Sequence, residues 1–160
     1  TLTVTATDSA GNSSETTLNI TIDTTTSNSI EITDENDDGV INSSEATTPD
    51  ISGKVEAGST IDSLVITDED NNSITVDKDD ITLDDEGNYS VENVDLSSLS
   101  DGELNVTVTS TDIAGNQGSS SDTIQKDTTI SDTTASLDKD SDTGSSDSDG
   151  ITNDNTPTIT

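Results

Sequence analysis

The sequence lacks cysteine, methionine, tryptophan, phenylalanine and histidine, and Tyr89 is its single aromatic residue. Without cysteine no disulfide can form, and without cysteine or histidine the usual ligand sets of structural zinc are missing. The same absences remove the His- and Cys-based general bases and nucleophiles, and the acidic residues have no flanking apolar pocket that could raise a carboxyl pKa. We therefore expect a protein that is not an enzyme and whose fold is not cross-linked.

Positive charge is also scarce, because 4 basic residues stand against 35 acidic ones and the net charge is -31. Such a chain repels nucleic-acid phosphates and anionic lipid headgroups, so neither is an expected partner. No apolar run reaches the roughly 18 residues of a membrane-spanning helix, and no direct membrane insertion is expected. Only 24% of the residues are hydrophobic, which predicts a thin core. A hard cation held by oxygen atoms remains as a source of stability.

The acidic residues are most regularly arranged in residues 34–45, DENDDGVINSSE. Every fixed position of the calcium-loop pattern D-x-[DN]-x-[DN]-G-x5-E is matched, by Asp34, Asn36, Asp38, Gly39 and Glu45. Calcium takes about six to eight oxygen ligands, which requires inward-pointing side chains, a glycine for the sharp turn and a late carboxylate. We predict that the acidic and amide side chains of this set bind Ca2+ directly and that the Val40 carbonyl is a backbone ligand. The alternative is a solvated acidic loop.

The segments around this loop predict strands and not the flanking helices of an EF-hand. Ile30 and Ile32 alternate with polar residues before the loop, and Pro49 follows soon after it. Similar short alternating segments predict strands at 29–33, 50–56, 61–67, 73–77, 80–83, 88–94, 103–111 and 119–125. This number of short strands, separated by Asp, Asn, Gly and Ser clusters, is typical of an all-β, immunoglobulin-like β-sandwich.

The apolar residues of these strands make up the predicted core. We expect it to contain Ile30, Ile32, Ile51, Val55, Leu64, Ile66, Ile74, Val76, Ile81, Leu83, Tyr89, Val91, Leu104, Val106 and Val108. Tyr89 is interpreted as a core ring and not as a platform for a ligand.

Two blocks of sequence occur twice. LTVTATDSAGN at 2–12 returns within LNVTVTSTDIAGN at 104–116, and TPDIS at 48–52 returns as TPTIT at 156–160. Strands are predicted in the first block at 2–8 and after it at 17–25. The correspondences Asp8 with Asp112, Asn12 with Asn116 and Asp23 with Asp127 all have an offset of 104 residues.

These correspondences indicate a linear array of similar domains. We interpret residues 1–22 as the C-terminal strands of a preceding repeat, residues 23–126 as one complete repeat, and residues 127–160 as the N-terminal part of the next.

Several motifs together resemble the bacterial Ig-like tandem repeats of giant RTX-type surface and biofilm adhesins that leave the cell by type I secretion. The resemblance covers essentially the whole chain and is carried by ATDSAGN, STDIAGN, the DTT linkers, GNYSV, DLSSLSDGELNVTV and SDTG...SDGITNDNTPTIT. Tyr89 stands where this family often has tryptophan. The resemblance implies a secreted, monomeric stalk on the bacterial surface, in which neighbouring repeats contact one another and calcium stiffens the junctions. Other domains would bind the adhesion target.

Strand alternation predicts where the candidate ligands meet, because successive loops of a sandwich lie at opposite ends. The 34–45 loop, the 95–103 loop with Asp101, and Asp127 should converge at one end, and Asp23, Asp112 and Asn116 at the other. The next repeat offers a looser acidic pattern with four further calcium candidates, Asp140, Asp142, Asp147 and Asp149. A flexible Ser/Asp/Gly linker is the alternative for this last segment.

Other functions remain open at this point. NDNTP at 153–157 and ATDSAG at 6–11 resemble cadherin motifs, so a cadherin-like calcium-dependent repeat is one alternative. A module that binds carbohydrate or protein directly is another, although sugar sites usually need aromatic faces. The in-register threonines from Thr1 to Thr7 suggest ice binding, but exposed strand positions favour threonine in any case.

Overall fold

The computed structural model describes residues 1–146 and 148–160, and most of its regular structure is β-strand. The described residues form two compact units, Thr1–Thr128 and Thr129–Thr160. Within them the one helical element is a single 3-10 turn, Lys78–Asp80. The predicted all-β class is confirmed.

The chain begins with a hairpin of β1 (Leu2–Thr7) and β2 (Ser13–Leu18). The pairing starts at Leu2 opposite Leu18 and ends at Thr7 opposite Ser13. A second strand over 17–25 is therefore wrong, because beyond Leu18 no residue of β1 is left to supply the ladder hydrogen bonds that an extended segment needs.

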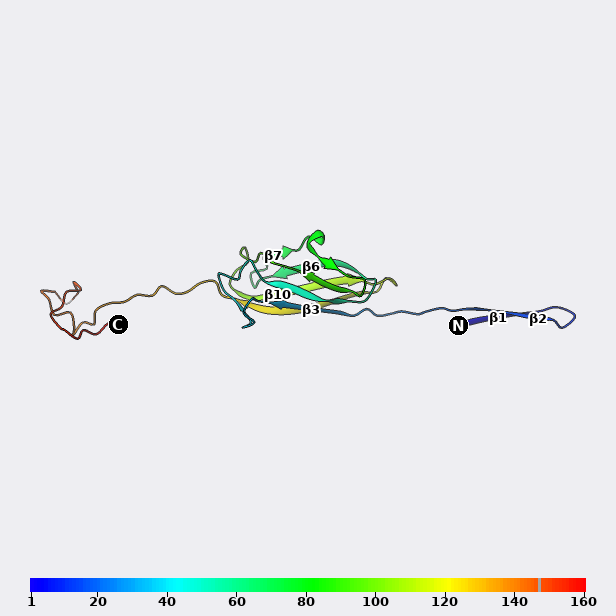
Figure 1. The fold of residues 1–160 in the computed structure, drawn as a ribbon, viewed down its shortest axis with the longest axis horizontal. Helices are drawn as coiled ribbons and strands as arrows, with labels where there is room; N and C mark the ends of the chain where they lie inside the picture. The colour runs from blue at the N-terminus through cyan, green and yellow to red at the C-terminus, as the bar shows by residue number, and fades with distance from the viewer. Residues whose placement is uncertain (147) are drawn as a thin grey trace. The chain divides into compact units, whose positions relative to one another are not determined.

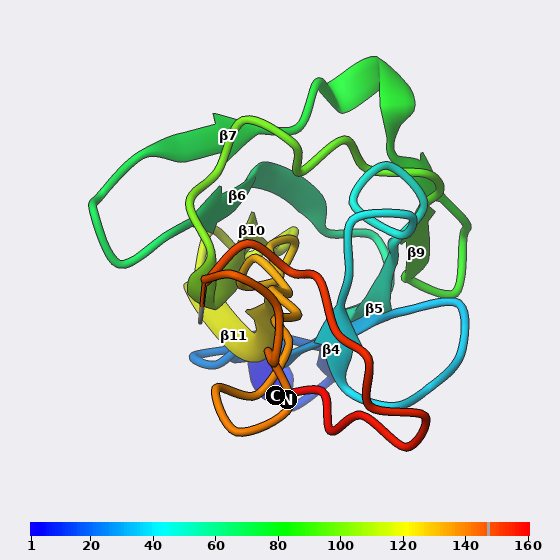
Figure 2. The same cartoon turned by 90° about the vertical axis from the view of Figure 1, so that its left-hand side faces the viewer.

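Residues 28–126 form two sheets (Figure 1). The strands are β3 (Asn28–Thr33), β4 (Val40–Ile41), β5 (Asp50–Val55), β6 (Thr60–Thr67), β7 (Ser73–Thr75), β8 (Thr82–Leu83), β9 (Asn88–Val91), β10 (Gly102–Thr111) and β11 (Gln117–Lys126). One sheet has the order β4-β11-β10-β6-β7 and the other β3-β5-β9-β8; only the β4–β11 pair is parallel. Figure 2 shows β6, β10 and β11 in one layer and β5 and β9 in the other.

The strands form where β-branched residues alternate with polar ones, a pattern that fits a pleated surface with one buried face. In β10, Leu104, Val106 and Val108 are fully buried, while the residues between them point outward. The pairing of β10 with β11 runs without interruption from Gly102 opposite Lys126 to Thr111 opposite Gln117. This register fixes which ends of the strands, and hence which loops, lie together.

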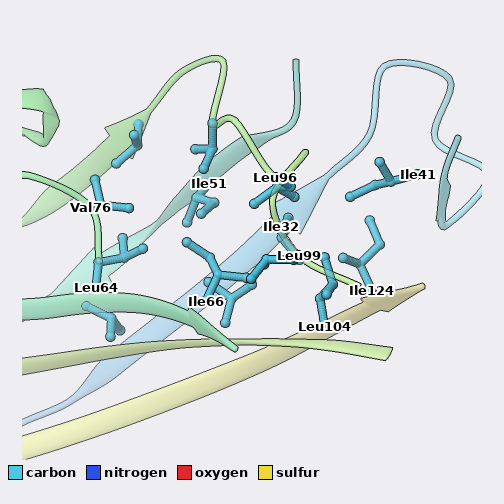
Figure 3. Close-up of a cluster of buried hydrophobic side chains, with 14 of the residues drawn as sticks. Ile32, Ile41, Ile51, Leu64, Ile66, Val76, Leu96, Leu99, Leu104 and Ile124 are labelled. Atoms are coloured by element: carbon cyan, nitrogen blue, oxygen red, sulfur yellow. The ribbon is translucent and has the colours of Figure 1, made fainter. Parts of the chain in front are cut away.

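The core lies between the two sheets (Figure 3), where Ile32 and Ile51 face Leu64, Ile66 and Leu104. Of the predicted core, Ile30, Ile74 and Ile81 are only partly buried, and the rest except Leu83 are buried. Leu83 is 39% exposed, so its assignment to the core is wrong: it ends a two-residue edge strand. Burial also extends to apolar residues outside the predicted core. Ile61, Val94 and Ile124 lie within predicted strands, and Ile41, Ala46, Leu96 and Leu99 lie outside them.

One type of loop occurs four times among the described residues. In each copy an aspartate accepts the backbone N–H of an asparagine four residues later and, at 2.8 Å, the side-chain amide of the same asparagine; the pairs are Asp8–Asn12, Asp68–Asn72, Asp84–Asn88 and Asp112–Asn116. The residue before the asparagine has positive φ in every copy. The asparagine amide is the main reason that the pKa of Asp8, Asp68 and Asp84 lies below its ordinary value, at about 2 for Asp68.

The C-terminal unit contains a short antiparallel pairing of Leu137 with Ile159, next to paired backbone hydrogen bonds between Ser136 and Thr160. In the sandwich, Ile32 pairs in the same way with Ile51. Since TPTIT matches TPDIS, Ile159 corresponds to Ile51, so the two units share this pairing.

Candidate metal centres at the two poles of the sandwich

The alternating strand directions give the sandwich two poles. We call N-terminal pole the end where residues 23–27 lead into β3, with the β5–β6 turn at 56–59 and the β10–β11 loop at 112–116. We call C-terminal pole the other end, with the loops at 34–49, 68–72 and 92–101 and the linker after β11.

Three carboxylates meet at the N-terminal pole. Asp23 from the linker, Glu56 from the β5–β6 turn and Asp112 from the β10–β11 loop each place an oxygen within 4.8 Å of the other two. Among the residues that the structure describes, this is the one such group of three acidic residues. Hard oxygen ligands at this spacing suit a divalent cation such as calcium.

Asp112 is the most constrained member of this triad. Its side chain is buried and accepts the backbone N–H groups of Ala114 and Asn116, as well as the Asn116 amide. Burial favours the protonated form, but these donors outweigh it, and the pKa of Asp112 lies below its ordinary value. A charged, fixed carboxylate is therefore ready at this pole. Asn116, predicted as a ligand, lies beside Asp112 and orients it.

Glu56 was not predicted from the sequence. It follows β5 directly, in a turn that has no metal-binding motif. Its partners are 33 and 56 residues away in the chain and reach it only through the strand order. Glu56 could have been predicted only from the strand order, because the β5–β6 turn must lie at the same pole as the loop that contains Asp112. The buried hydroxyl oxygen of Ser59, in the same turn, has no hydrogen-bond partner among the described residues.

The calcium-pattern loop of residues 34–45 lies at the C-terminal pole and wraps around its own backbone. Asp34 is buried and accepts N–H groups from Asp38 and Gly39, at 3.2 and 3.1 Å. Asn36 accepts from Asp38 N, and Asp38 in turn accepts from Val40 N. Burial opposes ionisation of Asp34, yet the loop N–H groups lower its pKa below the ordinary value.

The late carboxylate of this loop is buried as well. Glu45 is 5% exposed, and its Oε2 accepts the Asn42 N–H at 3.1 Å. Val40 begins β4, which pairs with the end of β11. The positive φ of Asp37 and Gly39 makes the tight turn that the pattern requires. The loop thus has the alternating inward oxygens of a calcium loop, although Asp34, Asp38 and Glu45 do not converge as closely as the triad does.

The other predicted C-terminal ligands also gather at this pole. Asp127 donates its N–H to the Ile41 carbonyl at 2.9 Å. Asp101 accepts the Thr128 hydroxyl at 2.8 Å and lies 3.2 Å from the ammonium of Lys126. The Thr128 hydroxyl first, and then Lys126, lower the pKa of Asp101. The expected convergence of these segments is confirmed, and Asp101 has an internal cation as its neighbour.

The candidates in the C-terminal unit repeat part of the 34–45 geometry. Asp142 is buried, and its Oδ2 accepts Gly150 N at 3.1 Å, as Asp34 accepts Gly39 N. Asp149 accepts Ile151 N, as Asp38 accepts Val40 N. Asp140 donates its N–H to Asp138, and Asp147 lies outside the described residues.

The two packed sheets of short strands, antiparallel except for the β4–β11 pair, define an immunoglobulin-like β-sandwich domain. The profile of the family described as bacterial Ig-like domain matches residues 25–128. The chain belongs to this family, and the predicted fold class and the Ig-like part of the resemblance are confirmed.

Two of the solved structures that resemble this chain come from adhesins. The tetra-tandem repeat in the extending region of a large adhesion protein is 31% identical over 85% of this chain and 33% of that one, with a TM-score of 0.53. A Ca2+-stabilized adhesin, which helps an Antarctic bacterium reach out and bind ice, is 27% identical over 86% of this chain and 34% of that one, with a TM-score of 0.39. The chain therefore spans about a third of the length of these structures.

No curated protein matches the sequence significantly. In the described part of the chain, no helix is long and apolar enough to cross a membrane.

Proposed function

We propose that the chain is a stalk segment of a large bacterial surface adhesin, built from tandem Ig-like repeats whose junctions are stiffened by calcium. The observation that carries the proposal is the triad of Asp23, Glu56 and Asp112, because it joins a residue of the linker to two loops of the sandwich. A cation at this position would fix the linker to the domain. The likeness to repeats from the extending region of an adhesion protein supports the stalk role.

The mechanism follows from charge. Without a cation, three carboxylates within 4.8 Å repel one another and favour a linker that swings away. With Ca2+ bound they become ligands of one ion, and the linker loses its freedom. If the site has the 0.1 to 1 mM dissociation constant typical of extracellular modules, millimolar calcium stabilises the repeat by roughly 1 to 3 kcal/mol.

This calcium dependence suits a protein that works outside the cell. At low intracellular calcium the junctions stay loose, which would ease passage through a secretion channel, and millimolar calcium outside would stiffen them. Secretion by a type I, RTX-type system and display on the bacterial surface are parts of this proposal. The chain would act as a monomeric spacer without enzymatic activity, and other domains would hold the adhesion target.

We further propose that the flanking segments belong to neighbouring repeats. Val4 corresponds to Val108, 104 residues further on; Val108 is fully buried in the sandwich, whereas Val4 is 54% exposed on its hairpin. Leu2 and Leu18 lie opposite each other and are likewise more than half exposed. An apolar hairpin face of this kind is expected to be covered by the missing strands of a sandwich.

The other candidate functions find less support. Tyr89 is 3% exposed and donates its hydroxyl proton to the Ser29 carbonyl, which confirms it as a core residue and leaves no aromatic face for a sugar. The cadherin-like alternative predicts the same dependence on calcium, but the match of residues 25–128 to the bacterial Ig-like family favours the stalk repeat.

The test is thermal unfolding of the 160-residue chain in 2 mM calcium, in 2 mM magnesium and in excess chelator, followed by circular dichroism. We expect calcium to raise the Tm by several degrees and magnesium to do much less. The Asp112→Asn variant should lose most of the calcium response. Identical melting curves in calcium and chelator would overturn the calcium part of the proposal.

A further inference from the structure

The C-terminal pole contains a buried positive charge in a chain that has very few. Lys126 is the last residue of β11, and its side chain is 4% exposed. Burying an ammonium group is costly unless it is paired and hydrogen-bonded. The Nζ atom of Lys126 has such partners: it donates to the Leu99 carbonyl at 2.7 Å and lies 3.2 Å from Asp101 Oδ1.

These contacts join three segments at one point. Leu99 and Asp101 belong to the loop before β10, Lys126 ends β11, and Thr128 belongs to the linker that follows. The Thr128 hydroxyl donates to the same Asp101 oxygen that faces Lys126, at 2.8 Å. Between them, the Asp127 N–H donates to the Ile41 carbonyl of β4. The first two residues of the linker are therefore both tied to the sandwich by hydrogen bonds to protein atoms.

The preceding linker has a different residue at the corresponding position. Ile22, Asp23 and Thr24 correspond to Lys126, Asp127 and Thr128 at the offset of 104 residues. The Asp-Thr pair is the same in both, but Ile22 is 84% exposed and has no charge. The linker that lacks the lysine is the one whose aspartate belongs to the carboxylate triad.

We propose that Lys126 is a built-in cation that fixes the C-terminal linker, residues 127 and 128, to the sandwich without any metal, with Asp101 as its counter-ion and not as a calcium ligand. The two poles then differ in kind. The linker at the N-terminal pole depends on an exchangeable cation, and the start of the linker at the C-terminal pole is held by a covalently attached one. Lys126 is a positioning residue, and its effect does not depend on calcium binding.

The test is amide hydrogen exchange of the 160-residue chain in excess chelator, resolved by NMR at Asp127 and Thr128. In the wild type we expect the Asp127 amide to stay protected, with the same protection in chelator and in calcium. In Lys126→Ile, which introduces the residue of the preceding linker, Asp127 should exchange about tenfold faster or more, while Val106 and Val108 keep their protection. Lys78→Met is the matched control, since it removes an exposed lysine from the 3-10 turn.

A second variant keeps the proposal testable if Lys126→Ile unfolds the sandwich. Thr128→Val removes only the hydroxyl that donates to Asp101, and it should loosen residues 127 and 128 without changing exchange in β10. Unchanged protection of Asp127 in Lys126→Ile with an intact core, or no effect of Thr128→Val, would overturn the proposal. Loss of Asp127 protection in the wild type on chelation would also overturn it. Calcium binding at the triad is measured separately by melting, so the two proposals can fail independently.

Discussion

The hydroxyl end of Tyr89 occupies the space that a β-carbon on Gly53 would need. The two residues lie opposite each other in the β5–β9 pair, and a Cβ on Gly53 would lie 2.5 Å from Tyr89 Oη and even closer to the Ser29 carbonyl oxygen. That oxygen is also the acceptor of the Tyr89 hydroxyl, at 2.8 Å. The single aromatic ring of the chain therefore fits against β5 and β3 only because Gly53 has no side chain.

Gly53→Ala should therefore destabilise the sandwich by about 1 to 3 kcal/mol, because neither the ring nor the β3 backbone can move without breaking the Tyr89–Ser29 hydrogen bond. Urea denaturation measures the change. Ser52→Ala, at the neighbouring exposed position, is the control and should stay within about 0.5 kcal/mol of the wild type. Equal midpoints for the two variants would contradict the tight fit.

Asp68 makes the stability depend on acid. Its pKa is lowered from 3.8 to about 2, chiefly by the Asn72 amide and then by the Ser100 N–H. A carboxyl with a lowered folded-state pKa stabilises the fold above pH 3.8, and this contribution is lost as the pH falls toward 2. Denaturation midpoints of Asp68→Asn should therefore fall less steeply than the wild type between pH 4 and 2. A slope in Asp68→Asn equal to that of the wild type would contradict this role of Asp68.

The calcium-pattern loop also packs against the core. Substitutions of the two residues of β4, one buried and one exposed, distinguish this packing from a general effect of changing the loop. Ile41 is fully buried, whereas Val40 is 38% exposed. Ile41→Ala should cost about 2 to 5 kcal/mol, because it leaves a cavity beside Leu96 and Ile124 (Figure 3). Val40→Ala should cost less than about 1 kcal/mol. The measurement is chemical denaturation of both variants in chelator. Similar midpoints for Ile41→Ala and Val40→Ala would show that the loop does not contribute to the packing of the core.

Glu56 tests the triad without touching the buried Asp112. Glu56→Gln should remove most of the calcium-induced rise in Tm, because one carboxylate ligand is lost. In chelator the same variant should be as stable as the wild type or slightly more so, since like-charge repulsion falls. Glu86→Gln, an exposed residue of the β8–β9 turn at the same pole, is the control and should keep the full calcium response. A full response in Glu56→Gln would exclude this residue as a ligand.

Period-two alternation was enough to find most of the sandwich. Strands such as β6 and β10 differ from the predicted ranges by a single residue, because each has a continuous row of apolar side chains on one face. β4 escaped prediction, since a two-residue strand has no period. Leu96 and Leu99 escaped for a related reason. They are single apolar residues in an acidic loop, and they join the core through segments distant in the chain: the Leu96 N–H donates to the Ala46 carbonyl, and the Leu99 carbonyl accepts from Lys126.

The candidate sites divide in the same way. The candidate ligands of the 34–45 loop lie close together in the sequence, so their spacing alone is enough to predict them. The repeat offset and the alternation of strand directions predicted that Asp23 lies near Asp112. Glu56 and Lys126 have no motif, and their roles depend on neighbours more than 20 residues away in the chain.

The sequence by itself determined the fold class, the repeat, the acidic calcium pattern and the absence of disulfides, because these depend on composition and on spacing within short segments. Only the tertiary structure decided which carboxylates share a pole, that Asp101 faces an ammonium group, and that Tyr89 needs Gly53 beside it. Pairs of this kind form when strands distant in the chain come into register, and their electrostatic and packing energies depend on distances that no local pattern contains.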